Sequence, residues 1–122
     1  MKRTRSILVG GLALGALLVP AGALADSTYC NTDAQACMNA HRAGSRIYLS
    51  ITTQRPLDRY TLCVDGARLH CKSFAFLVRS DGTRYSRVLW NRNFQSEGYV
   101  RYRARWRNGD QTLGTLTFRH RR

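Results

Sequence analysis

Four arginines occupy every second position of one short segment near the C-terminal end. The segment GYVRYRARWRNGDQTLGTLTF covers residues 98–118, and the four are Arg101, Arg103, Arg105 and Arg107. Alternate residues of a β-strand point to the same face of a sheet, so a strand would align the four guanidinium groups. Guanidinium forks match phosphate and carboxylate oxygens. The pattern predicts a binding track for an anionic partner, or else the solvated face of a half-buried sheet.

Electrostatic repulsion along such a row is too small to decide between these two interpretations. Same-face neighbours on a strand lie ~7 Å apart, where two like charges in water repel by about 0.6 kcal/mol. Dissolved salt lowers that repulsion further. A sheet therefore tolerates the row with or without a ligand.

The titratable residues form no catalytic motif in the sequence. After residue 25 the chain holds three histidines, six aspartates and Glu97, and it contains no GxSxG, HExxH or P-loop motif. The enzymatic alternative is a small secreted ribonuclease that uses Glu97, one of the histidines and Arg101 or Arg103 for general acid–base catalysis. Because the strand pattern of those enzymes is absent, we expect a protein that is not an enzyme and takes no cofactor.

Four cysteines lie in two closely spaced pairs. The segments are CNTDAQAC, with Cys30 and Cys37, and CVDGARLHC, with Cys63 and Cys71. Neither pair has the CxxC spacing of a zinc site, and cysteines of exported chains are usually oxidised. We therefore predict two local disulfides and no metal.

The second cysteine pair brackets a loop that suggests another class of function. Protease inhibitors present a substrate-like residue on a loop whose order is imposed before binding. Here Arg68 or Leu69 would enter the specificity pocket of an extracellular protease. The alternative is a bridged hairpin without a partner, turning at Asp65 and Gly66.

The N-terminal end has the pattern of a secretory signal peptide. Basic residues come first, an uncharged apolar run covers residues 7–19, and Ala23 and Ala25 fit a signal peptidase site. The run is shorter than the about 20 residues that cross a membrane. We predict that residues 1–25 are removed and that residues 26–122, one small domain, are secreted to the extracellular space.

Positive charge dominates the composition. The whole chain carries +13, and loss of Lys2, Arg3 and Arg5 with the leader leaves +10, with Lys72 as the single remaining lysine. High net charge attracts anionic surfaces in general, although it also serves solubility alone. The expected partner is a cell-wall polymer, an acidic polysaccharide, a nucleic acid or an acidic protein.

Two kinds of secondary structure are expected after the leader. Thr32 and Gln35 form a capping box and Gly44 is a natural stop, which predicts a short helix over 33–42. The period then changes to two, beginning with RIYLSITT at 46–53. Asp-Gly and Asn-Gly pairs recur between such runs and mark hairpins, so we expect six or seven antiparallel strands in a sandwich.

The arginine segment itself is expected to form a bulged hairpin. A three-residue loop, Arg107 to Gly109, with Gly109 left-handed, pairs Val100 with Leu116. The same register pairs Tyr102 with Gly114 and leaves Leu113 beside the arginines.

The run SEGYVRYRARW…LGTLTF is similar to the closing strand pair of immunoglobulin-like sandwiches. An acidic-Gly corner precedes alternating strand residues in both, and the resemblance covers about the last twenty-five residues. It implies an immunoglobulin-like sandwich, and the short N-terminal helix that the capping residues predict would precede it. The chain departs from the family because the Cys…Trp…Cys signature is missing and Tyr102 stands where the second cysteine would be.

Overall fold

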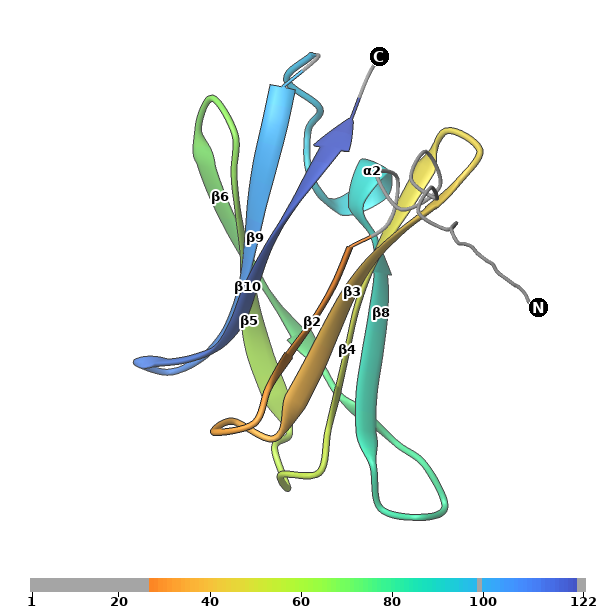
Figure 1. Ribbon diagram of the computed structural model, residues 1–122, viewed down its shortest axis with the longest axis vertical. Coiled ribbons are helices and arrows are strands. Elements are labelled where there is room, and N and C mark those ends of the chain that lie inside the picture. Colours follow the sequence, from red (N-terminus) through yellow and green to blue (C-terminus); the bar gives the residue numbers. More distant parts are fainter. Residues whose placement is uncertain (1–26, 99, 121–122) are drawn as a thin grey trace, which may run out of the picture.

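Two antiparallel sheets packed face to face form the part of the chain that the computed structural model describes, residues 27–98 and 100–120 (Figure 1). The elements are β2 (Ser27–Asn31), β3 (Ala36–Ala43), β4 (Arg46–Thr53), β5 (Arg59–Asp65), β6 (Leu69–Ala75), β7 (Leu77–Val78), β8 (Arg84–Leu89), α2 (Trp90–Asn93), β9 (Val100–Asn108) and β10 (Gln111–His120). One sheet has the order β10-β9-β5-β6, and the other has the order β2-β3-β4-β8-β7. The predicted mainly β fold is confirmed, with nine strands in the described part rather than six or seven. The predicted signal peptide, residues 1–25, lies outside the described residues.

The segment predicted as a short helix, 33–42, is instead the turn and second strand of a β2–β3 hairpin. The prediction is wrong because the residues that resemble a helix cap build a turn. The Asn31 side chain accepts hydrogen bonds from the backbone N–H groups of Asp33 (3.0 Å) and Ala34 (3.4 Å). In β3, Met38 and small apolar residues alternate with polar ones and are buried. Burial of this face outweighs the helix propensity of the segment.

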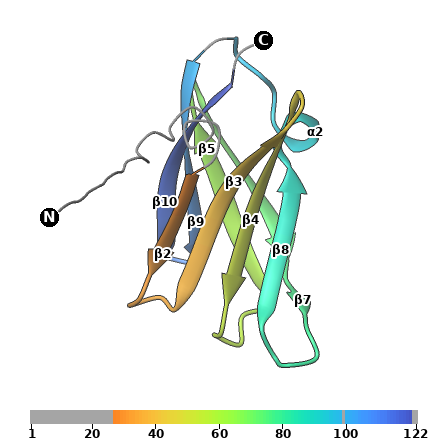
Figure 2. The same cartoon turned by 45° about the vertical axis from the view of Figure 1, so that its right-hand side comes forward.

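Side-chain hydrogen bonds close the sandwich where β2 runs beside β10 (Figure 2). The Ser27 hydroxyl donates to the carbonyl oxygen of Thr117 at 2.9 Å, and the Asn31 amide donates to that of Leu113 at 3.0 Å. Because these strands belong to different sheets, the contacts tie the two sheets together. Within 27–98 and 100–120, no helix has the length and apolar character that a membrane span requires.

The β9–β10 hairpin has a different register from the predicted one. Asn108 pairs with Gln111 across a two-residue turn, so Val100 pairs with His120 rather than with Leu116. The turn lies further along the chain than the predicted loop, and a bulge adds one more residue, so every predicted pair is displaced by four residues along β10. The apolar faces of the two strands still coincide, as the prediction required.

A bulge does occur, but it lies in β10 between Thr112 and Gly114. It lets Leu113 turn into the core, where it is fully buried, instead of standing beside the arginines. Gly114 follows without a side chain, since a Cβ there would lie 1.6 Å from Cε of Met38 on the opposite sheet. Gly109 has the predicted left-handed conformation, with φ 60°.

Aromatic packing fills the core near α2. The ring of Trp90 lies 4.7 Å from the ring of Tyr102 and 5.5 Å from that of Phe118. Tyr102 pairs directly with Phe118 rather than with Gly114 as predicted. The side chain of Asn91, the next residue of α2, accepts a 2.8 Å hydrogen bond from the backbone N–H of Ile47 in β4, which fixes α2 at this end of the sandwich.

Candidate functional site

The outer face of the β10-β9-β5-β6 sheet presents the four arginines singled out in the sequence. Arg101, Arg103 and Arg105 are exposed and Arg107 is half-buried, whereas the residues between them are buried in the core. Strand alternation therefore points all four guanidinium groups away from the core. The row extends over about 20 Å of strand.

Two more arginines reach this face from neighbouring strands, and the sequence analysis missed both. Arg119 of β10 is the direct cross-strand partner of Arg101. Arg59, at the start of β5, lines one hollow together with Arg107. The alternation of β5 and β10 was visible in the sequence, but the register that brings these residues to the row was not. We call the complete set the arginine face: Arg59, Arg101, Arg103, Arg105, Arg107 and Arg119.

Acidic residues compensate little of this charge. On the outer side of the described strands of this sheet, Asp65 is the only acid, and its carboxylate lies 3.8 Å from Nη2 of Arg103. Both side chains are well exposed, and such pairs contribute only about 0–1 kcal/mol to stability. Arg101 and Arg119 face each other directly, an arrangement that destabilises a sheet. The face is strongly positive.

Two hollows lie along the row. One has a volume of about 210 Å³ and includes Arg59, Thr61, Ser73 and Arg107 in its lining. The Thr61 and Ser73 hydroxyl oxygens lie 3.2 Å apart there. The other has a volume of about 80 Å³ and lies beside the second disulfide. Guanidinium and hydroxyl donors around a hollow are the groups that bind an oxyanion.

Both predicted disulfides are present. Cys30–Cys37 and Cys63–Cys71 each join directly opposite residues of one hairpin. Cys63 also pairs across β9 with Arg105, so the second bridge lies on the arginine face. The two bridges fit a chain that folds outside the reducing cytosol.

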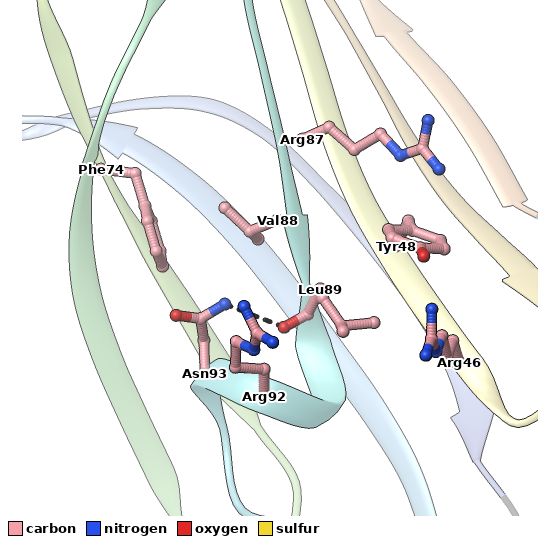
Figure 3. A pocket seen from close by; sticks show the side chains of 8 residues that line it. All are labelled: Arg46, Tyr48, Phe74, Arg87, Val88, Leu89, Arg92 and Asn93. Carbon is pink, nitrogen blue, oxygen red and sulfur yellow. Dashed lines mark hydrogen bonds between the residues drawn. The ribbon is translucent and has the colours of Figure 1, made fainter.

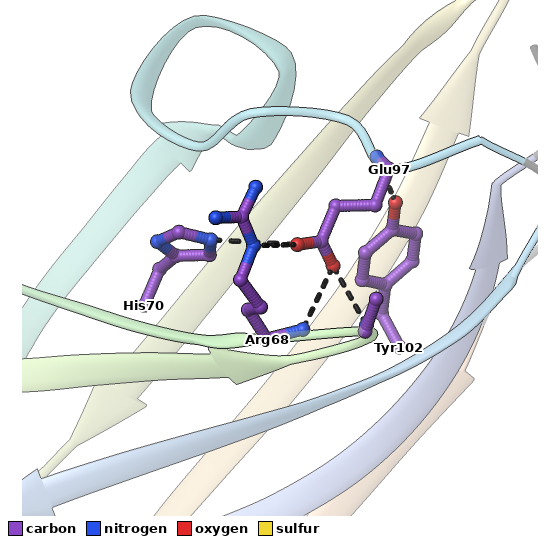
Figure 4. Close-up of polar contacts among 5 residues, drawn as sticks. Arg68, His70, Glu97 and Tyr102 are labelled. Atoms are coloured by element: carbon purple, nitrogen blue, oxygen red, sulfur yellow. Dashed lines mark hydrogen bonds and ion pairs between the residues drawn. The ribbon is translucent and has the colours of Figure 1, made fainter.

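Glu97 fastens the β5–β6 loop to the end of the sandwich (Figure 4). Its carboxylate accepts hydrogen bonds from the backbone N–H groups of Ala67 (2.7 Å) and Arg68 (3.2 Å). The carboxylate also lies 3.5 Å from Nε2 of His70 and 3.6 Å from Nε of Arg68. Burial raises the pKa of the Glu97 carboxyl, but the backbone hydrogen bonds from Arg68 and Ala67, together with His70, outweigh burial and lower it overall.

The residue set considered for a ribonuclease is only partly brought together. Glu97 contacts His70, whereas Arg101 and Arg103 point to the outer side of β9. A general base works best with a pKa near the operating pH, and the pKa of Glu97 is shifted the other way. We therefore assign Glu97 a structural role in holding the loop.

The two residues of the inhibitor alternative lie at the tip of the β5–β6 hairpin. The Arg68 side chain is 73% exposed, and Leu69 is 57% exposed. Between them and β5 the chain turns tightly, with the Gly66 N–H donating to the carbonyl oxygen of Arg68 at 3.1 Å. The tip of the hairpin presents both side chains to solvent, and Leu69 begins β6, an edge strand of its sheet.

Both predicted surfaces thus belong to one sheet. The arginine face covers its outer side, and the loop with Arg68 and Leu69 lies at the end of β5 and β6.

Comparison with known protein families, with curated protein sequences and with solved structures finds no match for this chain.

Proposed function

We propose that the protein is a secreted, non-catalytic module that binds an anionic partner through the arginine face. The observation that carries this proposal is Arg101 directly opposite Arg119, with Asp65 as the only acid on the outer side of the described strands of that sheet. Like charges in this position weaken a sheet, and a bound anion reverses the effect. A cell-wall polymer, an acidic polysaccharide, a nucleic acid or an acidic protein supplies such charges.

The spacing of the arginines favours a polymer over a small ion. Successive guanidinium groups on β9 are set ~7 Å apart in a straight line, so one ion meets only part of the row. A flexible polyanion meets all of it and releases condensed counterions as it binds. Binding should therefore weaken steeply with salt.

Single-stranded DNA and heparin serve as probes of the arginine face. The affinity for each is measured over a range of salt concentrations for the wild type and for the variant Arg101→Ser, Arg103→Ser, Arg105→Ser. For single-stranded DNA each lost phosphate contact lowers the log–log salt slope by about 0.7, so the variant should lose about 2. Thermal stability should change little because the three side chains are exposed.

A matched control removes three arginines of the other sheet. Arg55 lies beside β4, Arg79 and Arg84 lie beside or on β8, and replacement of these three by Ser lowers the net charge equally. This control should keep the wild-type slope. Equal losses in both triple variants would mean that net charge alone attracts the polyanion, and the arginine row would be only a solvated face.

We also propose that the sandwich is immunoglobulin-like. The strand orders support this, because β3-β4-β8-β7 and β5-β9-β10 follow the A-B-E-D and C-F-G orders of that fold. A tyrosine corner supports it too, since the Tyr102 hydroxyl bonds the backbone of Glu97 just before β9. In that motif the second cysteine comes two residues after the tyrosine, so Ala104 rather than Tyr102 stands at the cysteine position.

Inhibition of an extracellular protease is the alternative, and the exposure of Arg68 and Leu69 is the observation that favours it. A panel of secreted proteases, assayed with the wild type and with Arg68→Ala, tests this function. Inhibition that Arg68→Ala abolishes at unchanged melting temperature would support it, and no inhibition of any protease would exclude it.

A further inference from the structure

A third hollow lies on the other sheet, where β8 meets α2 (Figure 3). Its volume is about 620 Å³, within the range of roughly 300–1,000 Å³ that is usual for small-ligand sites. Residues of β4, β6, β8 and α2 form its walls. None of them belongs to the arginine face, so this hollow is a separate feature of the molecule.

Three arginines give the hollow its charge. Arg46, Arg87 and Arg92 line it, and all three are exposed. The described residues of the lining include no aspartate or glutamate. The hollow is therefore cationic without an internal counterion.

Tyr48 lies between two of these arginines, Arg46 and Arg87 (Figure 3). The guanidinium carbon of Arg87 lies 4.1 Å from the centre of the Tyr48 ring, a cation–π contact. Arg46 lines the hollow beside Tyr48. The interaction with Arg46 is the largest cause of a lowered pKa of the Tyr48 hydroxyl; burial opposes it, and Arg87 lowers the pKa further. Arginine held through its face keeps its N–H edges available for an oxyanion.

The far side of the hollow is apolar. Leu89 lies next to Tyr48. Val88 and Phe74 lie on the other side of β8 from Tyr48 (Figure 3). Val88 is buried and Phe74 is half-buried, so the Phe74 ring forms a fixed wall. Asn93 fastens α2 here by donating a 2.9 Å hydrogen bond to the carbonyl oxygen of Leu89. A hollow with positive charge on one side and apolar surface on the other suits a ligand that has an anionic end and an apolar end.

We propose that this hollow binds an organic phosphate monoester. The phosphate lies between Arg46 and Arg87 at the Tyr48 hydroxyl, and an aromatic or aliphatic body extends along Leu89 toward Phe74. A phosphate monoester carries about −1.5 to −2 charge and three acceptor oxygens, which match several guanidinium forks better than a monoanion does. The site does not depend on the arginine face, so either proposal can fail without the other.

Titration of the purified protein with 1-naphthyl phosphate tests this site. Two control ligands are titrated in the same way: inorganic phosphate, which has only the phosphate group, and 1-naphthol, which has only the aromatic ring system. We expect 1-naphthyl phosphate to bind at least about tenfold more tightly than either part, with amide shifts in the NMR spectrum at Val88, Leu89 and the Asn93 side chain. Weaker binding of 1-naphthyl sulfate, a monoanion, supports the phosphate head, and equal binding overturns that choice.

Three variants separate a built site from general charge. The pair Arg46→Ser, Arg87→Ser should weaken 1-naphthyl phosphate by about tenfold or more, while the charge-matched pair Arg79→Ser, Arg84→Ser stays within about twofold of the wild type. Phe74→Leu should weaken 1-naphthyl phosphate but leave inorganic phosphate unchanged. The proposal would be overturned if the Arg46→Ser, Arg87→Ser variant bound 1-naphthyl phosphate as tightly as the wild type, or if the NMR amide shifts mapped to the arginine face. Melting curves verify that each variant is folded.

Discussion

The backbone N–H of Glu97 donates a 2.6 Å hydrogen bond to the hydroxyl oxygen of Tyr102. The same glutamate holds the β5–β6 loop through its carboxylate, and Tyr102 is buried against Trp90. The pair therefore connects the core, the β8–β9 connection and the loop at the end of the sheet. Replacing the residues that make these contacts should change the stability of the protein measurably.

Replacing Tyr102 by Phe should lower the free energy of unfolding by about 1–3 kcal/mol. The ring packing stays, but the Glu97 N–H loses its acceptor in a partly buried place. Urea denaturation measures the loss. Tyr85→Phe is the matched control, because Tyr85 lies on the outer side of β8. Equal stability of the two variants would show that the hydrogen bond contributes nothing.

Gly66→Ala should destabilise the protein by about 1–3 kcal/mol, since it overpacks the loop. A Cβ at Gly66 would lie 2.6 Å from the Tyr102 ring and 2.7 Å from Oε1 of Glu97. Removing the Glu97 side chain relieves one of these contacts, so Gly66→Ala combined with Glu97→Ala should lose less than the sum of the two single losses. Additive losses in thermal unfolding would argue against direct crowding.

Glu97 should make stability depend on pH in the acidic range. The pKa of its carboxyl is below the ordinary value of 4.5 in the folded protein. A lowered pKa contributes stability that is fully present above 4.5 and is lost as the pH falls through the folded value. The melting-temperature difference between wild type and Glu97→Gln should therefore shrink from about pH 7 to about pH 3. A difference that is constant with pH would contradict this assignment.

Arg119→Thr should change stability and binding in opposite directions. It removes the repulsion with Arg101, so the free energy of unfolding should rise by about 0.2–1 kcal/mol at low salt and the gain should fade at high salt. It also removes one contact of the arginine face, so the salt slope for single-stranded DNA should fall by about 0.7. Tighter DNA binding by this variant would count against the proposed function.

Local patterns in the sequence were enough to predict several features of the structure. The alternation in β9 determined which residues of that strand are buried, and it set Arg101, Arg103 and Arg105 on the outer side. The cysteine spacings determined the disulfide pairing, because residues so close in sequence meet within one hairpin. Period and loop length are properties of a few neighbouring residues, so they are readable without knowledge of the rest of the chain.

Contacts between segments far apart in the sequence decided the features that the sequence analysis predicted wrongly or missed. Residues 33–42 carry helix-capping signals, but Met38 is buried against β10, and that long-range burial made the segment a strand. The bulge at Leu113 likewise exists because the core accepts that side chain, and it set Arg119 opposite Arg101. The Glu97 contacts and the hollow beside Tyr48 join strands from both halves of the chain. Their partners lie many residues apart, and only the packing of the two sheets brought them together.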